Sequence, residues 1–263
     1  MLIDTHCHLS AYLYKRFGRS ITPILKQIEK NKILTISNSL SLTSYKMDMK
    51  IAQRSKYVIP SFGIHPQNAY KYIDKTGLIK KLIRKNKIIG EIGLDYFNVR
   101  DKGRYLAQKK IFKLFLSKTK DKVISVHAEG AEKDVLNLLK EYENNKVIIH
   151  WFSGDFAVLE NMIDEGYYFS INPKVKFSNN IKKIVHKIPL KQLLTETDNP
   201  IGPKSYMNKI GMPILIRDVI NEIAKIKDKN SRQIEKIVQD NFVRLALSTS
   251  VINYKKYDLS IFS

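Results

Sequence analysis

The sequence predicts an α/β fold, a (β/α)8 TIM barrel with extra C-terminal helices. Eight short apolar runs alternate with amphipathic stretches along its 263 residues. Strict alternation of strand and helix implies a parallel sheet with right-handed crossovers, and eight such units close a barrel. Barrels of this kind occupy chains of this length as one domain, so we expect a single domain over residues 1–263.

The predicted strands are short runs rich in Ile, Val and Leu. Apolar runs of this kind, bounded by polar residues, are typical of strands that a parallel sheet buries on both faces. We place the strands at Leu2–Thr5, Lys32–Ile36, Tyr57–Gly63, Lys87–Glu91, Val123–His127, Lys146–His150, Tyr167–Ile171 and Gln192–Thr195.

The amphipathic stretches between these strands predict helices. They lie at Thr22–Lys30, Ser44–Ser55, Ile73–Lys85, Arg104–Lys120, Glu132–Glu143, Asp155–Glu165 and Asn179–His186. Pro23 suits the first turn of the first helix, because its missing N–H breaks no helical hydrogen bond there. Two more helices, Ile214–Lys227 and Ser231–Leu247, should cover the outside of the barrel, and the tail from Val251 is left unassigned.

The composition is that of a folded protein outside the membrane. Apolar residues make up 43% of the chain and charged residues 27%, which excludes a disordered chain. No segment is long and apolar enough to span a bilayer, and the N-terminus enters a strand without a basic leader. The single cysteine, Cys7, rules out a disulfide within the chain and fits a reducing compartment. We therefore expect a cytoplasmic protein.

The net charge is strongly positive. The chain carries 46 Lys and Arg against 25 Asp and Glu, a formal charge of +21. Such an excess attracts polyanions, of which nucleic acid is the commonest. The alternative is a general bias toward lysine on solvated helix faces, and the charge by itself does not decide between the two.

Ionisable residues gather at the ends of the predicted strands. His6 and His8 are two apart in extended chain, so they share one face and can bind one ion, while Cys7 points to the other face. The whole set at strand ends is His6, His8, His65, Glu91, His127, His150 and Asp198. Active sites of these barrels lie at the C-terminal ends of the strands. Since unpaired polar groups there cost free energy, one or two divalent ions would explain the set.

Five motifs occur in order at these strand ends. They are Asp4-Thr5-His6-Cys7-His8-Leu9, Gly63-Ile64-His65-Pro66, Gly90-Glu91-Ile92-Gly93-Leu94-Asp95, His150-Trp151-Phe152-Ser153-Gly154 and Glu196-Thr197-Asp198-Asn199-Pro200. Together they resemble the motifs of the TatD-type metal-dependent deoxyribonucleases, a branch of the amidohydrolase-like barrels. By this resemblance one ion is held by His6, His8 and Asp198. A second ion is held by His127 and His150, and Glu91 bridges the two.

The resemblance further implies a metal-dependent hydrolase that takes DNA as substrate and removes nucleotides from an end. Two divalent metal ions, such as zinc, manganese or magnesium, suit this ligand set and would bind the scissile phosphate and acidify a water. Asp198 is the expected general base, and Glu91 takes part as the bridging ligand. His65 is expected to contact the phosphate or the leaving group, and the alternative is a turn histidine ordered by Pro66.

Other residues near the mouth are candidates for supporting roles. Trp151 can stack on a base, although an aromatic at a barrel rim can equally serve packing. Lys174 and Lys176, after the seventh strand, are expected to guide the phosphate backbone. Asp4 either hydrogen-bonds a ligand histidine or caps its loop, and Glu196 is a further candidate partner of a ligand.

Two positions depart from the family pattern, and both concern the substrate side. Many members have arginine two residues after the fifth-strand histidine, where this chain has Glu129. Lys209-Ile210-Gly211-Met212-Pro213 stands where Arg-Asn-Glu-Pro is frequent. The metal assignment is therefore firmer than DNA as the substrate.

Two other functions stay open at this point. A related amidohydrolase acting on a small amide, lactone or ester would keep the same dinuclear metal site. A nucleic-acid-binding protein without activity would explain the charge but would leave the strand-end groups without a role. The sequence does not decide the oligomeric state, and a monomer is compatible with it.

Overall fold

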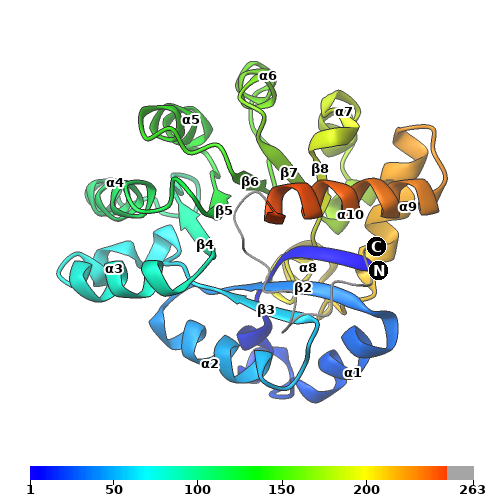
Figure 1. The fold of residues 1–263 in the computed structure, drawn as a ribbon, viewed down its shortest axis with the longest axis horizontal. Helices are drawn as coiled ribbons and strands as arrows, with labels where there is room; N and C mark the ends of the chain where they lie inside the picture. The colour runs from blue at the N-terminus through cyan, green and yellow to red at the C-terminus, as the bar shows by residue number, and fades with distance from the viewer. Residues whose placement is uncertain (248–263) are drawn as a thin grey trace.

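The computed structural model describes residues 1–247 as a ring of eight parallel strands surrounded by helices (Figure 1). The strands are β1 (Leu2–Cys7), β2 (Ile33–Asn38), β3 (Val58–Ser61), β4 (Ile88–Gly93), β5 (Val123–His127), β6 (Val147–His150), β7 (Tyr168–Ile171) and β8 (Leu193–Thr195). The helices are α1 (Thr22–Asn31), α2 (Leu42–Ala52), α3 (Thr76–Lys85), α4 (Gly103–Leu116), α5 (Glu132–Glu141), α6 (Phe156–Asp164), α7 (Asn179–Lys187), α8 (Ile201–Met207), α9 (Leu215–Ile226) and α10 (Ser231–Leu247). The predicted alternation of strand and helix is confirmed.

The strands pair in parallel within two hydrogen-bonded sheets, β1 to β3 and β4 to β8. On one side an isolated bridge between Phe62 and Ile89 joins β3 to β4. On the other side β1 lies beside β8, where the Thr195 hydroxyl donates to the Ile3 carbonyl (2.5 Å) and the Thr5 hydroxyl donates to the Thr195 carbonyl (3.0 Å). The ring therefore continues across both junctions, and the carboxyl ends of all eight strands face one side.

The strands are buried on both faces, as their apolar composition predicts. Every residue of β1, β2 and β4 is buried. Helix α9 covers the strands with an apolar stripe, Ile216, Val219, Ile220 and Ile223, which follows the helical period. Burying one such side chain fully stabilises the fold by roughly 1.5–3 kcal/mol.

The amino ends of β1 and β8 are covered by the last helix. In α10 the Asn241 amide donates to the carbonyls of Leu190 (2.7 Å) and Leu193 (2.8 Å), and the Gln239 amide donates to the Met1 carbonyl (2.5 Å). Because α10 occupies this side, the polar strand ends can meet a substrate only from the opposite side of the barrel.

Some predicted helix boundaries are wrong for identifiable reasons. The helix predicted to begin at Ile73 begins at Thr76, because Pro66–Tyr72 forms a separate 3-10 helix. The helix predicted at Ser44 begins at Leu42, because the hydroxyl of Ser41 accepts a hydrogen bond from the Ser44 amide (3.2 Å) and caps it.

Other elements were not predicted or lie outside the description. Helix α8 (Ile201–Met207) was not predicted, since its glycine and proline are poor helix formers. The unassigned tail from Val251 and the end of the single domain predicted over 1–263 fall on residues 248–263, outside the described residues. Within residues 1–247, no helix has the length and hydropathy that crossing a membrane requires.

Candidate metal centre

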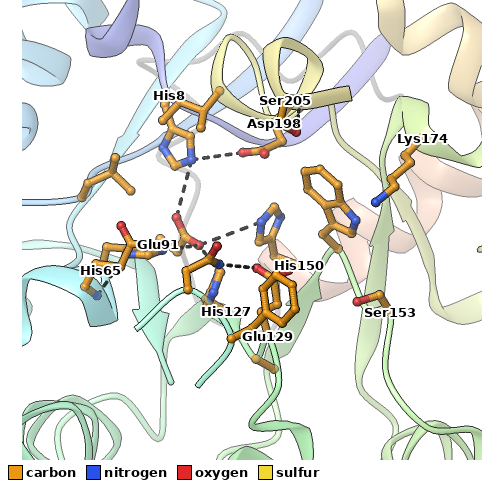
Figure 2. A pocket seen from close by; sticks show the side chains of 18 of the residues that line it. His8, His65, Glu91, His127, Glu129, His150, Ser153, Lys174, Asp198 and Ser205 are labelled. Carbon is orange, nitrogen blue, oxygen red and sulfur yellow. Dashed lines mark hydrogen bonds and ion pairs between the residues drawn. The ribbon is translucent and has the colours of Figure 1, made fainter. Parts of the chain in front are cut away.

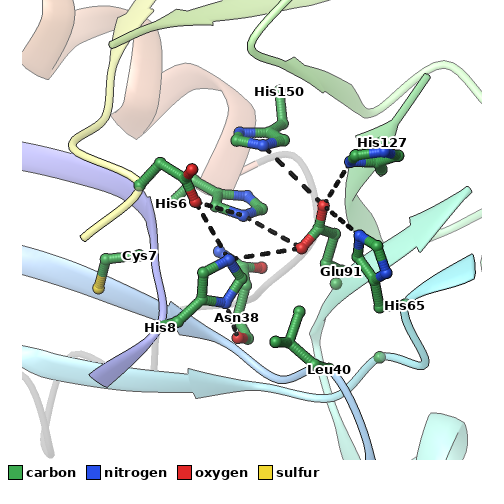
Figure 3. A network of polar contacts seen from close by, with 12 residues as sticks. His6, Cys7, His8, Asn38, Leu40, His65, Glu91, His127 and His150 are labelled. Carbon is green, nitrogen blue, oxygen red and sulfur yellow. Dashed lines mark hydrogen bonds and ion pairs between the residues drawn. The ribbon is translucent and has the colours of Figure 1, made fainter. Parts of the chain in front are cut away.

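Six predicted ligands converge at the carboxyl ends of the strands, around the side chain of Glu91 (Figure 3). They come from five different strands or the loops after them, and all are largely buried. They are His6, His8, Glu91, His127, His150 and Asp198. The residues lie close together because the carboxyl ends of the strands of a parallel barrel form one rim.

The two oxygens of Glu91 face two different groups of ligands. Glu91 Oε2 lies 3.5 Å from Nε2 of His6 and 3.5 Å from Nε2 of His8. Glu91 Oε1 lies 2.8 Å from His127 Nδ1 and 3.9 Å from His150 Nε2. A carboxylate in this position can give one oxygen to each of two ions, as the bridging assignment requires.

Asp198 completes the group on the Oε2 side. Its Oδ1 lies 3.1 Å from His8 Nε2 and 3.9 Å from His6 Nε2. The ligand atoms of His6, His8 and Asp198 all lie within 4.8 Å of one another, and so do those of Glu91, His127 and His150. The structure thus brings together the two sets of residues that the resemblance assigns to two ions.

Hydrogen bonds to the other ring nitrogen show which histidines can bind metal. The Nδ1 atom of His8 lies 2.8 Å from the Asn38 carbonyl, which only accepts, so Nδ1 carries the proton. The Nδ1 atom of His150 lies 2.9 Å from the carboxylate of Glu196 and is a donor for the same reason. When either ring is neutral, its Nε2 therefore directs a lone pair at the centre, as a metal ligand must.

His127 faces Glu91 with Nδ1, whereas His8 and His150 face it with Nε2. The Nε2 atom of His127 lies 3.4 Å from Asp95 Oδ2. Burial by itself would lower the pKa of His127, but its contacts with Asp95 and Glu91 raise that pKa to about 10. Asp95 is itself fixed, since it accepts hydrogen bonds from the backbone amides of Phe97 (3.1 Å) and Asn98 (2.7 Å). Nδ1 is thus the atom that His127 can offer to an ion.

His65 lies beside this cluster but is not suited to bind metal. The Gln67 amide donates to His65 Nδ1 (3.2 Å), so the proton of the neutral ring sits on Nε2, which lies 3.5 Å from Glu91 Oε1. Burial lowers the pKa of His65 to about 4, which keeps the ring neutral. His65 therefore presents an N–H donor to the pocket.

The donor set fits divalent ions. Within residues 1–247, His6 Nε2 is buried and makes no hydrogen bond, which costs free energy unless another group binds it. Burial by itself would raise the pKa of Glu91, but the nearby imidazoles of His65 and His6 hold it well below its usual range. Ionised carboxylates among neutral imidazole nitrogens are the ligands that zinc, manganese and similar ions take.

The buried carboxylates Asp4 and Glu196 have different supporting roles. Asp4 accepts hydrogen bonds from the amide (2.9 Å) and hydroxyl (2.6 Å) of Thr197 and from the His6 amide (3.3 Å), so it caps the loop before Asp198. Of its two predicted roles, the structure supports the cap. Glu196 holds the ring of His150 and also accepts from the Ser170 hydroxyl. The sequence suggested such a contact with a candidate ligand.

One glycine that positions Asp198 was missed by the sequence reading. Asp198 has a left-handed backbone, φ 51°, and its carbonyl accepts from the amide of Gly202 (2.8 Å). A Cβ atom at Gly202 would lie 2.3 Å from Asp198 Oδ2 and 2.7 Å from Cζ3 of Trp151. Only glycine leaves both side chains where they are. No signal in the sequence pointed to this role, because helix α8 was itself not predicted.

A pocket of about 430 Å³ opens above the ligands (Figure 2). Of the predicted substrate-binding residues, His65, Trp151 and Lys174 line it, whereas Lys176 does not and lies 3.5 Å from Asp218 Oδ2. Lys174 Nζ lies 5.5 Å from the centre of the Trp151 ring. The sequence reading did not assign substrate contacts to Gln67, Asn68, Phe97, Asn98, Glu129, Ser153 and Ser205, which also line the pocket.

Comparisons with known proteins agree with this geometry. The sequence model of the TatD related DNase family matches residues 3–246. An uncharacterized metal-dependent hydrolase of Methanocaldococcus jannaschii is 32% identical over 248 residues, which cover 91% of this chain and 94% of the relative. The human deoxyribonuclease TATDN3 is 27% identical over 262 residues, which cover 93% of this chain and 94% of the relative.

A solved structure shares the fold. The crystal structure of YjjV, a TatD homologue from Escherichia coli K12, has a TM-score of 0.83 to this chain at 20% identity. The match covers 93% of this chain and 97% of the other. The family match runs from β1 into α10 and includes every residue of the candidate metal centre. This chain belongs to the TatD related DNase family of metal-dependent hydrolases.

Proposed function

We propose that this chain is a deoxyribonuclease that hydrolyses phosphodiester bonds and removes nucleotides from the end of a DNA strand. The observation that carries the proposal is Glu91, whose two oxygens face two sets of ligands directly below a pocket. The human relative TATDN3 is named a deoxyribonuclease. The formal charge of +21 also favours a polyanionic substrate.

Two divalent ions fit the ligand sets. His6, His8 and Asp198 would hold one ion, His127 and His150 would hold the other, and Glu91 would contact both. When bound, the ions act as Lewis acids toward the scissile phosphate and lower the pKa of a water. Glu196 and Asn38 hold the rings of His150 and His8 so that Nε2 stays available.

Asp198 is the proposed general base. Burial by itself would raise its pKa, but its hydrogen bond with His8 and the nearby histidines lower it, so Asp198 is ionised at neutral pH. Its carboxylate can accept the proton of the water whose oxygen forms the new bond to phosphorus. The bond from phosphorus to the leaving oxygen breaks, and the N–H of His65 can donate to an oxygen of the phosphate.

Contacts with the rest of the strand would come from the rim of the pocket. Trp151 is half-buried at the mouth and can stack on a base, which is tolerant of sequence. Lys174 lies over its ring and can bind the adjoining phosphate. Lys176 lies outside the pocket beside Asp218, so we propose that it contacts the backbone farther from the metals.

Metal removal and strand topology test this proposal. Chelation should abolish cleavage of DNA, and a divalent ion should restore it. A linear single strand should be degraded from its terminus, and a circular strand of the same sequence should survive. Affinity for DNA should also fall steeply with salt, because binding releases counterions. Equal cleavage of circular and linear strands would exclude an exonuclease, and turnover of a small amide without DNA cleavage would favour the amidohydrolase alternative.

The role of Asp198 has its own test. Asp198→Asn keeps the size of the side chain but removes the proton acceptor, so turnover should fall by roughly 100-fold or more. The midpoint of thermal unfolding should change little, because the Asp198 backbone contacts remain. If Asp198→Asn lost activity only because it lost folded protein, as a lowered unfolding midpoint would show, the catalytic assignment would be contradicted.

A further inference from the structure

The rim of the pocket carries opposite charges on two sides of the metal centre. Strands β5, β6 and β7 are neighbours in the sheet. Glu129 follows β5, Trp151 follows β6, and Lys174 lies in the 3-10 helix Pro173–Lys176 after β7. All three line the pocket, and Figure 2 shows Glu129 and Lys174 on different sides of His150. The rim thus runs from an anion through an aromatic ring to a cation.

Neither charge is neutralised by a neighbour. Glu129 Oε2 accepts a hydrogen bond from the Asn98 amide (2.8 Å), which also donates to Asp95 Oδ2 (3.1 Å). This contact fixes the carboxylate but leaves its charge in place. In the described part of the chain, neither Glu129 nor Lys174 takes part in an ion pair, whereas Lys176 lies within ion-pair distance of Asp218.

These charges impose a direction on a bound strand. Among the pocket-lining residues of the described range 1–247, Lys174 is the one lysine or arginine, and it attracts a phosphate. Glu129 repels a phosphate but accepts hydrogen bonds from hydroxyl groups. A strand whose scissile phosphate lies at the metal centre therefore gains most when its next phosphate lies at Lys174 and its terminal nucleoside lies toward Glu129.

We propose that Glu129 selects DNA ends that carry a hydroxyl group and rejects ends that carry a phosphate. This inference rests on the proposed nuclease function. A terminal phosphate near Glu129 would place like charges side by side in a partly desolvated pocket, where their repulsion is stronger than in water. A terminal hydroxyl in the same place can donate to the free oxygen of Glu129.

Oligonucleotides of one sequence that differ only in their end groups test the proposal. They carry a hydroxyl or a phosphate at the 3′ end and, separately, at the 5′ end. At the end from which digestion starts, kcat/KM should be about tenfold or more higher for the hydroxyl than for the phosphate. At the other end the phosphate should have no effect. Equal rates for both groups at both ends would overturn the proposal.

Variants of Glu129 assign the discrimination to this residue. Glu129→Gln keeps the shape and the contact with Asn98 but removes the charge. The ratio of kcat/KM for hydroxyl ends to kcat/KM for phosphate ends should therefore fall to a value of about 1–3. Glu129→Lys should invert the ratio. The matched control Glu160→Gln removes an exposed carboxylate on α6, away from the pocket, and should keep the wild-type ratio. An unchanged ratio in Glu129→Gln would refute the role of Glu129.

A binding measurement separates this proposal from the nuclease function. Fluorescence anisotropy of the same oligonucleotides in chelator reports affinity while no hydrolysis occurs. Tighter binding of hydroxyl ends, lost in Glu129→Gln, would support end selection even if the metal-loaded protein failed to cleave DNA. Cleavage of DNA together with equal binding and equal rates for both ends would support the nuclease and overturn the selection by Glu129.

Discussion

The metal centre and the rim of the pocket are built in different ways. Five of the six candidate ligands are buried and His127 is nearly so, and several are oriented by a second contact, as His8 is by Asn38 and His150 by Glu196. On the rim, Phe97 is 66% exposed, and Glu129 and Lys174 are partly exposed. Side chains of the centre are packed among the strand ends, whereas those of the rim are partly in contact with solvent. The centre therefore fixes the chemistry, and the rim can adapt to a substrate.

This contrast explains one of the two departures from the family pattern, the one at Glu129. The motifs that resemble the family supply the ligands and their supports, all of which lie inside the barrel mouth. Glu129, which stands where many members have arginine, lies on the rim with one side-chain contact, to Asn98. A charge can change sign there without an effect on packing, because solvent reaches the side chain. Four predictions measure how sharply the two regions differ.

The largest effect is expected from Glu91→Ala in the centre. Loss of the carboxylate that faces both ligand sets should lower affinity for both ions by more than about 100-fold and abolish hydrolysis. Metal content per chain, measured by elemental analysis, is the readout. The control Glu141→Ala, an exposed residue of α5, should keep full occupancy. Two ions per chain in Glu91→Ala would show that Glu91 is not the bridge.

Acid should release metal from the centre. Burial lowers the pKa of His8, but Asp198 and Glu91 raise it to about 9, and contacts with Asp95 and Glu91 raise that of His127 to about 10. Both raised values lie above 7, so without metal both rings are protonated at neutral pH and must lose a proton to bind an ion. Metal affinity should rise with pH, by about tenfold per unit for each proton released. Calorimetry in buffers of different ionisation enthalpy counts these protons, and no release at neutral pH would contradict the prediction.

A smaller effect is expected when a support of the centre is changed. Glu196→Gln leaves every ligand in place but replaces the carboxylate that holds His150 and accepts from Ser170. Affinity for the ion at His150 should fall by about 10–100-fold, the usual cost of such a partner. Titration with metal should show one weakened ion and one unchanged ion. Equal weakening of both would mean that Glu196 supports the fold of the mouth as a whole.

The smallest effects are expected on the rim. Lys174→Ala should weaken DNA binding about five- to tenfold and reduce the salt dependence by the share of one phosphate contact. Lys176→Ala should weaken it less than about twofold, because Asp218 already offsets its charge. Metal content should stay constant in both variants. An equal loss of DNA affinity in the two variants would show that DNA contacts lysines inside and outside the pocket alike.

The sequence predicted the eight strands and the residues at their ends with little error. Periodicity and strand-end placement suffice for this, since parallel strands of a barrel bring their carboxyl ends to one rim. The segments between strands were less predictable. Helix α8 and the 3-10 helix Pro66–Tyr72 lie in loops that follow strand ends. Their conformation depends on how these loops pack at the open end of the barrel, which no local sequence pattern specifies.

The sequence by itself determined the fold class, the order of the candidate ligands and their side of the barrel, because each depends on the regular alternation of strand and helix. Only the tertiary structure decided how each ligand is used. The proton of His8 is placed by the carbonyl of Asn38, and the ring of His150 by Glu196, 46 residues away. The charge of Lys176 is offset by Asp218, while Lys174 remains unpaired within residues 1–247. These properties depend on contacts between residues far apart in the chain, which no local pattern of residue types specifies.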